Sequence, residues 1–234
     1  MNIHEIKKRF QHLISPREGL LGVAAYETVL NSLMPAQQRN LMAAGTGESV
    51  MVIGVFHTPS VIEKINTRSH GKLDRDAWNV YAREYHTLNA LLNKTVFSLA
   101  EFVKGDPIPA TRENTAQKID RVEDFYDLCI SHRVGAELAG LGWRGKNELI
   151  VTREQGCAVR FASVICPDEL PPGQRMENQC GDCTACLKVC PYLRKKDVLK
   201  NYREQCRRFI VALDLEGDVC GKCVKACYEH WAHQ

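Results

Sequence analysis

The sequence of 234 residues lacks any apolar run approaching the roughly 18 residues that a membrane-spanning helix requires. Its first ten residues, from Met1 to Phe10, contain neither an apolar stretch nor a pair of arginines, so we expect no secretory signal. No charge of one sign dominates, since the formal net charge is only +3. A hydrophobic content of 44% and a charged content of 25% are typical of a folded globular chain rather than a disordered one. We therefore expect a cytoplasmic protein that has no membrane span and no general affinity for nucleic acid.

Cysteine, in contrast, is abundant. The chain has 11 cysteines, and eight of them lie between residues 180 and 227. Disulfide-rich scaffolds are usually shorter and secreted, and we expect no signal in this sequence that would target it to an oxidising compartment. Clustered cysteines in a cytoplasmic chain instead indicate metal ligands.

Two runs of cysteine carry the strongest motif. The first run, Cys180 to Pro191, follows the spacing C-x2-C-x2-C-x3-C-P of bacterial ferredoxins that bind [4Fe-4S] clusters. The second run, Cys220 to Cys227, lacks one cysteine of the full pattern, and Cys206, fourteen residues before Cys220, is available to supply it. In two-cluster ferredoxins the fourth cysteine of each run ligates the other cluster. This crossing predicts two four-thiolate sets: Cys180, Cys183, Cys186 and Cys227 in the first, and Cys190, Cys206, Cys220 and Cys223 in the second.

Zinc and disulfides are the competing interpretations of these cysteines. A structural zinc site is usually built from two pairs of ligands, which the first run fits poorly. Disulfides would require an oxidising compartment. Two [4Fe-4S] clusters are the preferred prediction, with zinc as the main alternative.

The distribution of cysteine and proline also suggests a division near residue 175, after a proline-rich segment from Cys166 to Gln174. We expect an α/β cofactor-binding domain over residues 1–174 and a ferredoxin-like domain over residues 175–234. The first domain is predicted to begin with an amphipathic helix that Ser15 and Pro16 end. Further helices are predicted at residues 26–33, ended by Pro35, at 73–92 and at 131–139, and strands at 20–25, 50–56, 148–152 and 158–165. This alternation predicts a layered α/β or α+β core, of which we take α+β as the fold class.

The first domain also carries motifs of a known family. Residues Ala139 to Asn147 read Ala-Gly-Leu-Gly-Trp-Arg-Gly-Lys-Asn, which resembles the AGLGW-x-GKN motif of epoxyqueuosine reductases. The segment from Tyr81 to His86 is similar to that family's YA…DYH segment, and Cys206 lies where the family places an isolated cluster ligand. The resemblance extends over roughly residues 20 to 230, and its motifs are specific in combination.

The resemblance implies a fold and a chemistry. Epoxyqueuosine reductases and the related reductive dehalogenases join a cobalamin-binding domain of flavin- or nitroreductase-like architecture to a two-cluster ferredoxin module. Electrons pass through the clusters to a corrinoid that performs the reduction. The residues that would contact this cofactor are Tyr85, His86, Gly142, Trp143, Gly145, Lys146 and Asn147. Each also has a structural interpretation, since such a loop can be a simple turn before a strand and the tyrosines can belong to the core.

Two departures from the family pattern are visible. The family's proton-donating aspartate stands seventeen positions before the motif tryptophan, where this chain has Tyr126 with Asp127 beside it. We take Tyr126 and Asp127 as the catalytic candidates. The family's C-terminal helical-repeat domain is not expected in this chain, and the low net charge gives no substitute patch, so a tRNA substrate is not expected.

Two functions remain open. The favoured one is a cobalamin-dependent reductase that acts on a substrate other than tRNA and receives electrons from a ferredoxin or flavodoxin. The alternative is a two-cluster electron-transfer protein with no substrate of its own. The same fold family also accommodates flavin, although no set of residues in this chain indicates flavin specifically.

Overall fold

The computed structural model describes residues 2–111, 118–121, 124 and 130–232. At its centre is a four-stranded sheet in the order β1-β2-β8-β5, in which all neighbouring strands are antiparallel. These strands are β1 (Gly19–Ala25), β2 (Ser49–Phe56), β5 (Asp106–Ile108) and β8 (Val159–Cys166). β2 is buried along its whole length because it is a central strand with both faces covered.

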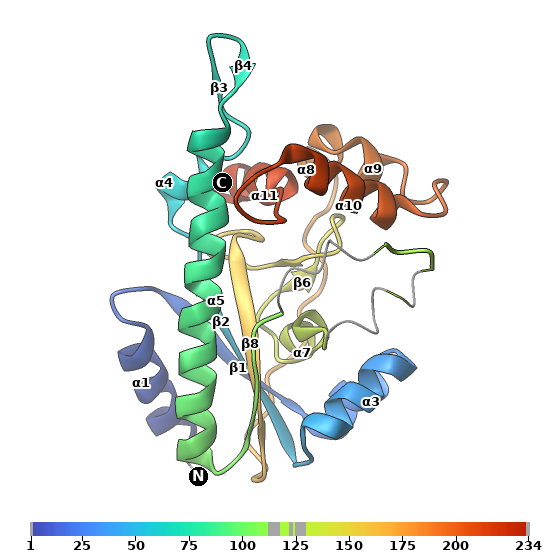
Figure 1. Cartoon of the computed structure of the whole chain (residues 1–234). Helices are drawn as coiled ribbons and strands as arrows, with labels where there is room; N and C mark the ends of the chain where they lie inside the picture. Colours follow the sequence, from blue (N-terminus) through green and yellow to red (C-terminus); the bar gives the residue numbers. More distant parts are fainter. Residues whose placement is uncertain (1, 112–117, 122–123, 125–129, 233–234) are drawn as a thin grey trace.

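Two helices cover one face of this sheet (Figure 1). α1 (Ile3–Ile14) begins at Asn2, whose side chain accepts a hydrogen bond from the His4 backbone N–H, and it buries Ile6, Phe10 and Ile14. α5 (Arg75–Val103) is the long helix that crosses the sheet, and Asp74 caps it by accepting from the Ala77 backbone N–H. Its apolar stripe lies against the sheet, which explains the three- and four-residue spacing in its sequence.

The opposite face is covered by α2 (Tyr26–Asn31), α3 (Pro35–Ala44) and α7 (His132–Leu138). The predicted opening helix, the predicted strands at 20–25, 50–56 and 158–165, and the helix at 131–139 are confirmed within a residue or two. None of the helices in the described part of the chain is long and apolar enough to cross a membrane.

Two local predictions were wrong, and one helix was not predicted. The predicted helix at 26–33 does end before Pro35, but Pro35 also begins α3, because proline is compatible with the first turn of a helix. α5 continues beyond Leu92 to Val103, since its later turns still bury apolar residues against the sheet. The strand expected at 148–152 is only the two-residue β7 (Ile150–Val151), paired with β6 (Trp143–Arg144).

The cysteine-rich part lies at one end of the sheet, beside the first turns of α5 (Figure 1). A single hydrophobic cluster joins it to the sheet domain, with Trp78 and Trp143 from one side and Leu213 and Val224 from the other. The proline-rich segment also lies against the sheet domain, where the Gly173 backbone N–H donates to the Val23 carbonyl at 2.8 Å. The remaining elements are α4 (Pro59–Ile62), β3 (Arg68–Ser69), β4 (Lys72–Leu73), α8 (Ala185–Val189), α9 (Pro191–Arg194), α10 (Tyr202–Leu213) and α11 (Lys222–Ala232).

Candidate functional site

The first cysteine set, Cys180, Cys183, Cys186 and Cys227, is brought together by the contact of α8 with α11. Burial, and after it the neighbouring thiols of the other three members, raise the pKa of Cys186 to about 11. Cys227 therefore lies with the first run of cysteines, although it is more than forty residues away in the sequence.

The second cysteine set, Cys190, Cys206, Cys220 and Cys223, forms a separate group. Burial raises the pKa of Cys206 to about 12, and the nearby thiols of Cys220 and Cys190 contribute to the rise. Burial also raises the pKa of Cys223, with the thiols of the other three members as the next causes. Cys206 reaches this group from α10, a helix that neither cysteine run contains.

Both sets consist of cysteine side chains alone, which is the ligand chemistry of a [4Fe-4S] cluster. Backbone N–H groups also point at sulfur, since Leu193 donates to the Cys190 Sγ at 3.5 Å. Within the residues that the structure describes, no three His, Cys, Asp or Glu side chains form a group that could hold a single metal ion.

A cavity of about 540 Å³ separates the second cysteine set from β8 and α5. All four cysteines of the second set line it, whereas no member of the first set is among its described lining residues. Its charged lining is mainly basic: Arg133, Arg160, Arg203, Arg207 and Lys222, against Glu148 and Asp218. Aromatic side chains supply much of the apolar wall: Tyr81, Tyr85, Phe161, Tyr192, Tyr202 and Phe209.

Arg160 is held rigidly in the wall of this cavity. Its guanidinium lies 4.0 Å from the centre of the Tyr85 ring and donates to Asn89 Oδ1 at 3.0 and 3.1 Å. A further bond to the Thr111 carbonyl measures 2.8 Å. Tyr85, one of the predicted cofactor residues, thus faces the cavity, whereas the neighbouring His86 is exposed and is not one of its lining residues.

A buried histidine in the same cavity was missed by the sequence analysis. His57 follows β2, and its Nδ1 lies 3.0 Å from Glu84 Oε2. Glu84 also accepts from the Thr58 backbone N–H and from Arg17 at 2.8 Å, so its pKa is lowered to about 2 despite the opposing effect of burial. Burial lowers the pKa of His57, and a neutral ring with Nδ1–H donated to the carboxylate follows. The only signal in the sequence was a glutamate at an apolar position of α5.

The predicted glycine-rich loop lies between this cavity and the first cysteine set. Asn147 lines the cavity, but its Nδ2 donates to Cys157 Sγ at 3.1 Å. Lys146 directs its ammonium to the Gly181 carbonyl at 2.7 Å. Gly142 and Gly145 have no room for a side chain, because an ideal Cβ at either would collide with the neighbouring strand β7.

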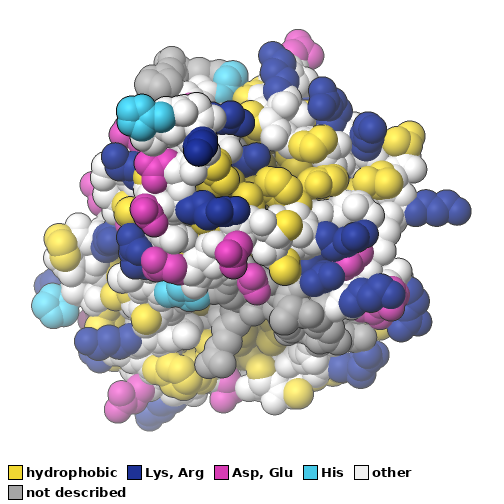
Figure 2. Space-filling view, turned by 45° about the horizontal axis from the view of Figure 1, so that its top comes forward, with side chains coloured by type: hydrophobic (Ala, Val, Ile, Leu, Met, Phe, Trp, Pro, Cys, Tyr) yellow, Lys and Arg dark blue, Asp and Glu magenta, His cyan; other side chains and the backbone are white. Residues whose placement is uncertain are grey.

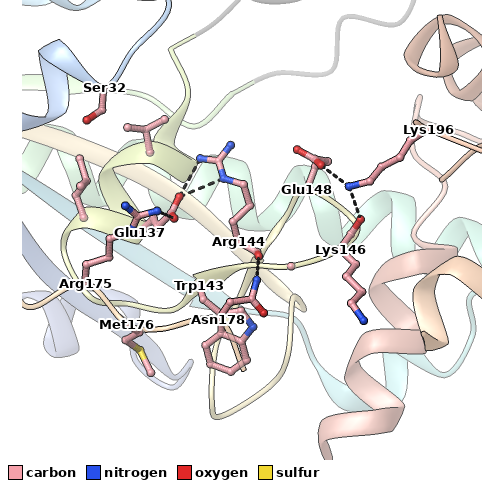
Figure 3. A pocket seen from close by; sticks show the side chains of 13 residues that line it. Ser32, Glu137, Trp143, Arg144, Lys146, Glu148, Arg175, Met176, Asn178 and Lys196 are labelled. Atoms are coloured by element: carbon pink, nitrogen blue, oxygen red, sulfur yellow. Dashed lines mark hydrogen bonds and ion pairs between the residues drawn. The ribbon is translucent and has the colours of Figure 1, made fainter. Parts of the chain in front are cut away.

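Trp143, Gly145 and Lys146 line a second cavity of about 600 Å³ on the other side of the loop (Figure 3). There Glu137 accepts two hydrogen bonds from Arg144, at 3.0 and 3.1 Å, and is also paired with Arg175. The charged groups drawn in this cavity are therefore largely paired with one another. Tyr126 and Asp127, the catalytic candidates, lie outside the described residues.

The chain contains one strongly basic segment, although its formal net charge is low. Residues 188–208, which run from α8 through α10, contain eight Lys or Arg and only two Asp or Glu. Figure 2 shows Lys and Arg side chains gathered on one side of the face that carries the cysteine-rich part. The expectation of no basic patch was drawn from the net charge of the whole chain and stays a prediction, since two of these basic side chains, Lys196 and Arg207, are paired with Glu148 and Glu204.

The architecture is that of known reductases. The structure of epoxyqueuosine reductase from Streptococcus thermophilus aligns with a TM-score of 0.55 and 18% identity, covering 97% of this chain and 66% of that one. A catabolic reductive dehalogenase in complex with 3-bromo-4-hydroxybenzoic acid aligns with a TM-score of 0.58 and 14% identity, covering 95% of this chain and 31% of that one. The chain thus has the mixed helix and strand fold that this class of reductases shares.

Among these reductases, the sequence is similar to epoxyqueuosine reductases. The chain is 37% identical over 173 residues to the epoxyqueuosine reductase of Escherichia coli strain K12, which covers 73% of this chain and 41% of that protein. It is 27% identical over 161 residues to the enzyme of Synechocystis, covering 67% of this chain and 49% of that one. No family model matches the chain. The chain is therefore similar in sequence to epoxyqueuosine reductases, and its matches span less than half the length of these relatives.

Proposed function

We propose that the protein is an iron–sulfur reductase that conducts electrons from the first cysteine set, through the second, into the 540 Å³ cavity. The observation that carries this proposal is the position of the second set, because all four of its cysteines line that cavity. A [4Fe-4S] cluster in each set would supply one-electron carriers. The proposed order of the two sets is supported by the lining of the cavity, which includes all four cysteines of the second set and no described residue of the first.

The finer form of the proposal assigns a corrinoid to the cavity and a ferredoxin-like fold to the cysteine-rich part. A bound corrinoid would supply a reducible cobalt centre for reductive chemistry. The chain's own residues fit a large polar ligand, since Arg160 and the aromatic walls provide fixed donors and flat apolar surfaces. His57 lines the cavity and engages Glu84 through Nδ1, so its second ring nitrogen would be the atom that can hold a hydrogen bond to a ligand or exchange a proton.

Metal and sulfide analysis of anaerobically purified protein tests the cluster assignment. We expect about eight irons and eight sulfides per chain. Two or fewer irons accompanied by stoichiometric zinc would contradict it.

The corrinoid assignment is tested by titrating the cluster-loaded protein with cob(II)alamin and recording the absorbance change. The variant Ile210→Trp places a bulky side chain in the cavity lining and should abolish the change. Val211→Trp is the matched control, because Val211 is the next residue of α10, is 47% exposed and is not one of the lining residues. An equal response in both variants, or none in the unaltered protein, would exclude this site for the corrinoid.

A second candidate function is a two-cluster electron carrier with no substrate. The observation that favours it is the glycine-rich loop, whose Lys146 and Asn147 donate to the chain itself rather than into an open site. Cluster-loaded protein that shows no corrinoid response but reduces a cytochrome or a dye would support this alternative.

The expectation of a substrate other than tRNA requires a separate test, because the basic segment 188–208 could attract a polyanion. Fluorescence anisotropy with labelled tRNA near physiological salt should show no saturable binding. Saturable binding that is weakened in Lys195→Ala and Lys200→Ala would overturn the expectation and locate the contact on this segment.

A further inference from the structure

The glycine-rich loop, residues 142–147, makes three contacts with the first cysteine loop. The Trp143 indole Nε1–H donates to Cys180 Sγ at 3.4 Å. The Lys146 ammonium donates to the Gly181 carbonyl at 2.7 Å, between the first two cysteines of the run. Asn178 joins the two loops. Its Nδ2 donates to the Arg144 carbonyl at 2.7 Å (Figure 3), and its Oδ1 accepts from the Cys180 backbone N–H at 2.8 Å.

The loop also reaches the opposite member of the first set. Asn147 donates to Cys157 Sγ at 3.1 Å, and Cys157 is only 3% exposed. The Cys157 thiol donates to the Cys223 carbonyl at 3.8 Å, and the Cys157 backbone N–H hydrogen-bonds to the Cys227 side chain. The two ends of the first set, Cys180 and Cys227, therefore both receive a hydrogen bond from a residue of the sheet domain.

The donor at Cys180 is fixed in place. Trp143 is 1% exposed, and its ring meets the edge of Trp231 with the ring centres 5.1 Å apart. The preceding residue, Gly142, has no room for a side chain where it stands, because an ideal Cβ there would overlap the Val151 carbonyl oxygen. The glycines of the motif thus have a structural role that requires no ligand, because they allow the close backbone packing that holds Trp143 against the cysteine loop.

Hydrogen bonds to cluster sulfurs are one of the factors that set the reduction potential of an iron–sulfur centre. A donor to a thiolate stabilises the reduced state more than the oxidised state, because the reduced cluster carries one more negative charge. A buried donor is more effective than an exposed one, since water does not compete with it.

We propose that Trp143 is a positioning residue that raises the reduction potential of the first cluster through its hydrogen bond to Cys180 Sγ. This inference rests on the proposed function, because it requires a cluster in the first set. It assigns the glycine-rich loop to the electron-transfer path rather than to the cofactor cavity. The step concerned is the gain of one electron by the cluster, with no bond made or broken.

The test is the pair of reduction potentials in Trp143→Phe, measured by redox titration followed with electron paramagnetic resonance. Phenylalanine keeps an aromatic ring but removes the N–H. The first cluster should become harder to reduce, by roughly tenfold in its equilibrium constant or ~59 mV for a one-electron couple. The second cluster should keep its potential.

Trp78→Phe is the matched control. Trp78 is also fully buried and also lies beside a cysteine, but its Nε1–H donates at 2.8 Å to the Cys220 carbonyl oxygen and not to a sulfur. The same loss of an indole there should leave the potential of the first cluster unchanged. Unchanged potentials in Trp143→Phe with both clusters present would refute the inference, whereas an unaltered protein without clusters would refute the proposed function instead.

A second measurement needs no substitution. Electron–nuclear double resonance on the unaltered reduced protein should detect two nuclei coupled to the first cluster. One is a nitrogen, identified by labelling with [¹⁵N]tryptophan, and the other is an exchangeable proton, identified by comparing samples in water and in deuterium oxide. Absence of both couplings would overturn the inference even if the Trp143→Phe protein failed to fold.

Discussion

A buried histidine makes the stability of this protein depend on pH. His132, at the start of α7, is fully enclosed, with Nε2 2.9 Å from the Pro109 carbonyl and Nδ1 2.8 Å from Ser163 Oγ. A carbonyl oxygen can only accept, so Nε2 carries the proton and Nδ1 accepts from the serine hydroxyl. Desolvation lowers the pKa of His132 from 6.5 to about 4, opposed by the Pro109 bond and helped by the positive charge of Arg160.

The sign of the pH effect follows from this shift. Between pH 6.5 and about 4 the unfolded chain holds a proton on His132 that the folded chain lacks, so stability falls as the pH falls through this window. The full effect is about 3 kcal/mol, and the part lost between about pH 7.5 and about pH 5.5 is about 1.3 kcal/mol. Carboxylates with lowered pKa values, such as Glu84, lose their contribution only at lower pH.

Urea denaturation of the cluster-loaded protein at these two pH values measures the effect. His132→Gln removes the titrating ring and retains an amide that can donate to Pro109, so its stability should depend less on pH than that of the unaltered protein by about 1.3 kcal/mol. His12→Gln, at an exposed position of α1, should retain the original dependence. If His132→Gln and the unaltered protein lose the same free energy on acidification, His132 is not held neutral in the fold.

Three further predictions follow from the contacts described. Cys227→Ser should perturb the first cluster and spare the second, as resolved by electron paramagnetic resonance, and loss of only the second would contradict the grouping of the two sets. Gly142→Ala should lower the free energy of unfolding by about 1–3 kcal/mol, because its Cβ would overlap the carbonyl oxygen of Val151; an unchanged urea midpoint would show that the strand can move aside. Glu84→Gln should cost about 1.5–3 kcal/mol in the same assay, since the neutral His57 and the partly exposed Arg17 lose a charged hydrogen-bond acceptor, whereas Glu101→Gln at an exposed position of the same helix should cost almost nothing.

The sequence alone predicted those helices, strands and cysteine spacings whose physical cause lies within a short stretch of the chain. The opening helix shows its apolar face in Ile6 and Phe10, and the central strands appear as continuous apolar runs because both faces of the sheet are covered. The spacing within Cys180 to Cys190 is local as well, since one loop and one helix turn determine how far apart those thiols can lie. Local pattern was ambiguous at Pro35, because a proline can follow one helix and begin the next.

What only the tertiary structure decided involves residues far apart in the sequence. The sequence could offer Cys206 as a ligand but could not show that α10 brings it to Cys220 and to the cavity, and it did not indicate that Trp143 meets Cys180. The pair of His57 and Glu84 was likewise not predicted, since a glutamate at an apolar position of α5 does not by itself indicate which side chain it meets. These contacts depend on how the long helix, the sheet and the cysteine-rich part pack around a shared core, and burial then gives each buried polar group its partner and its pKa.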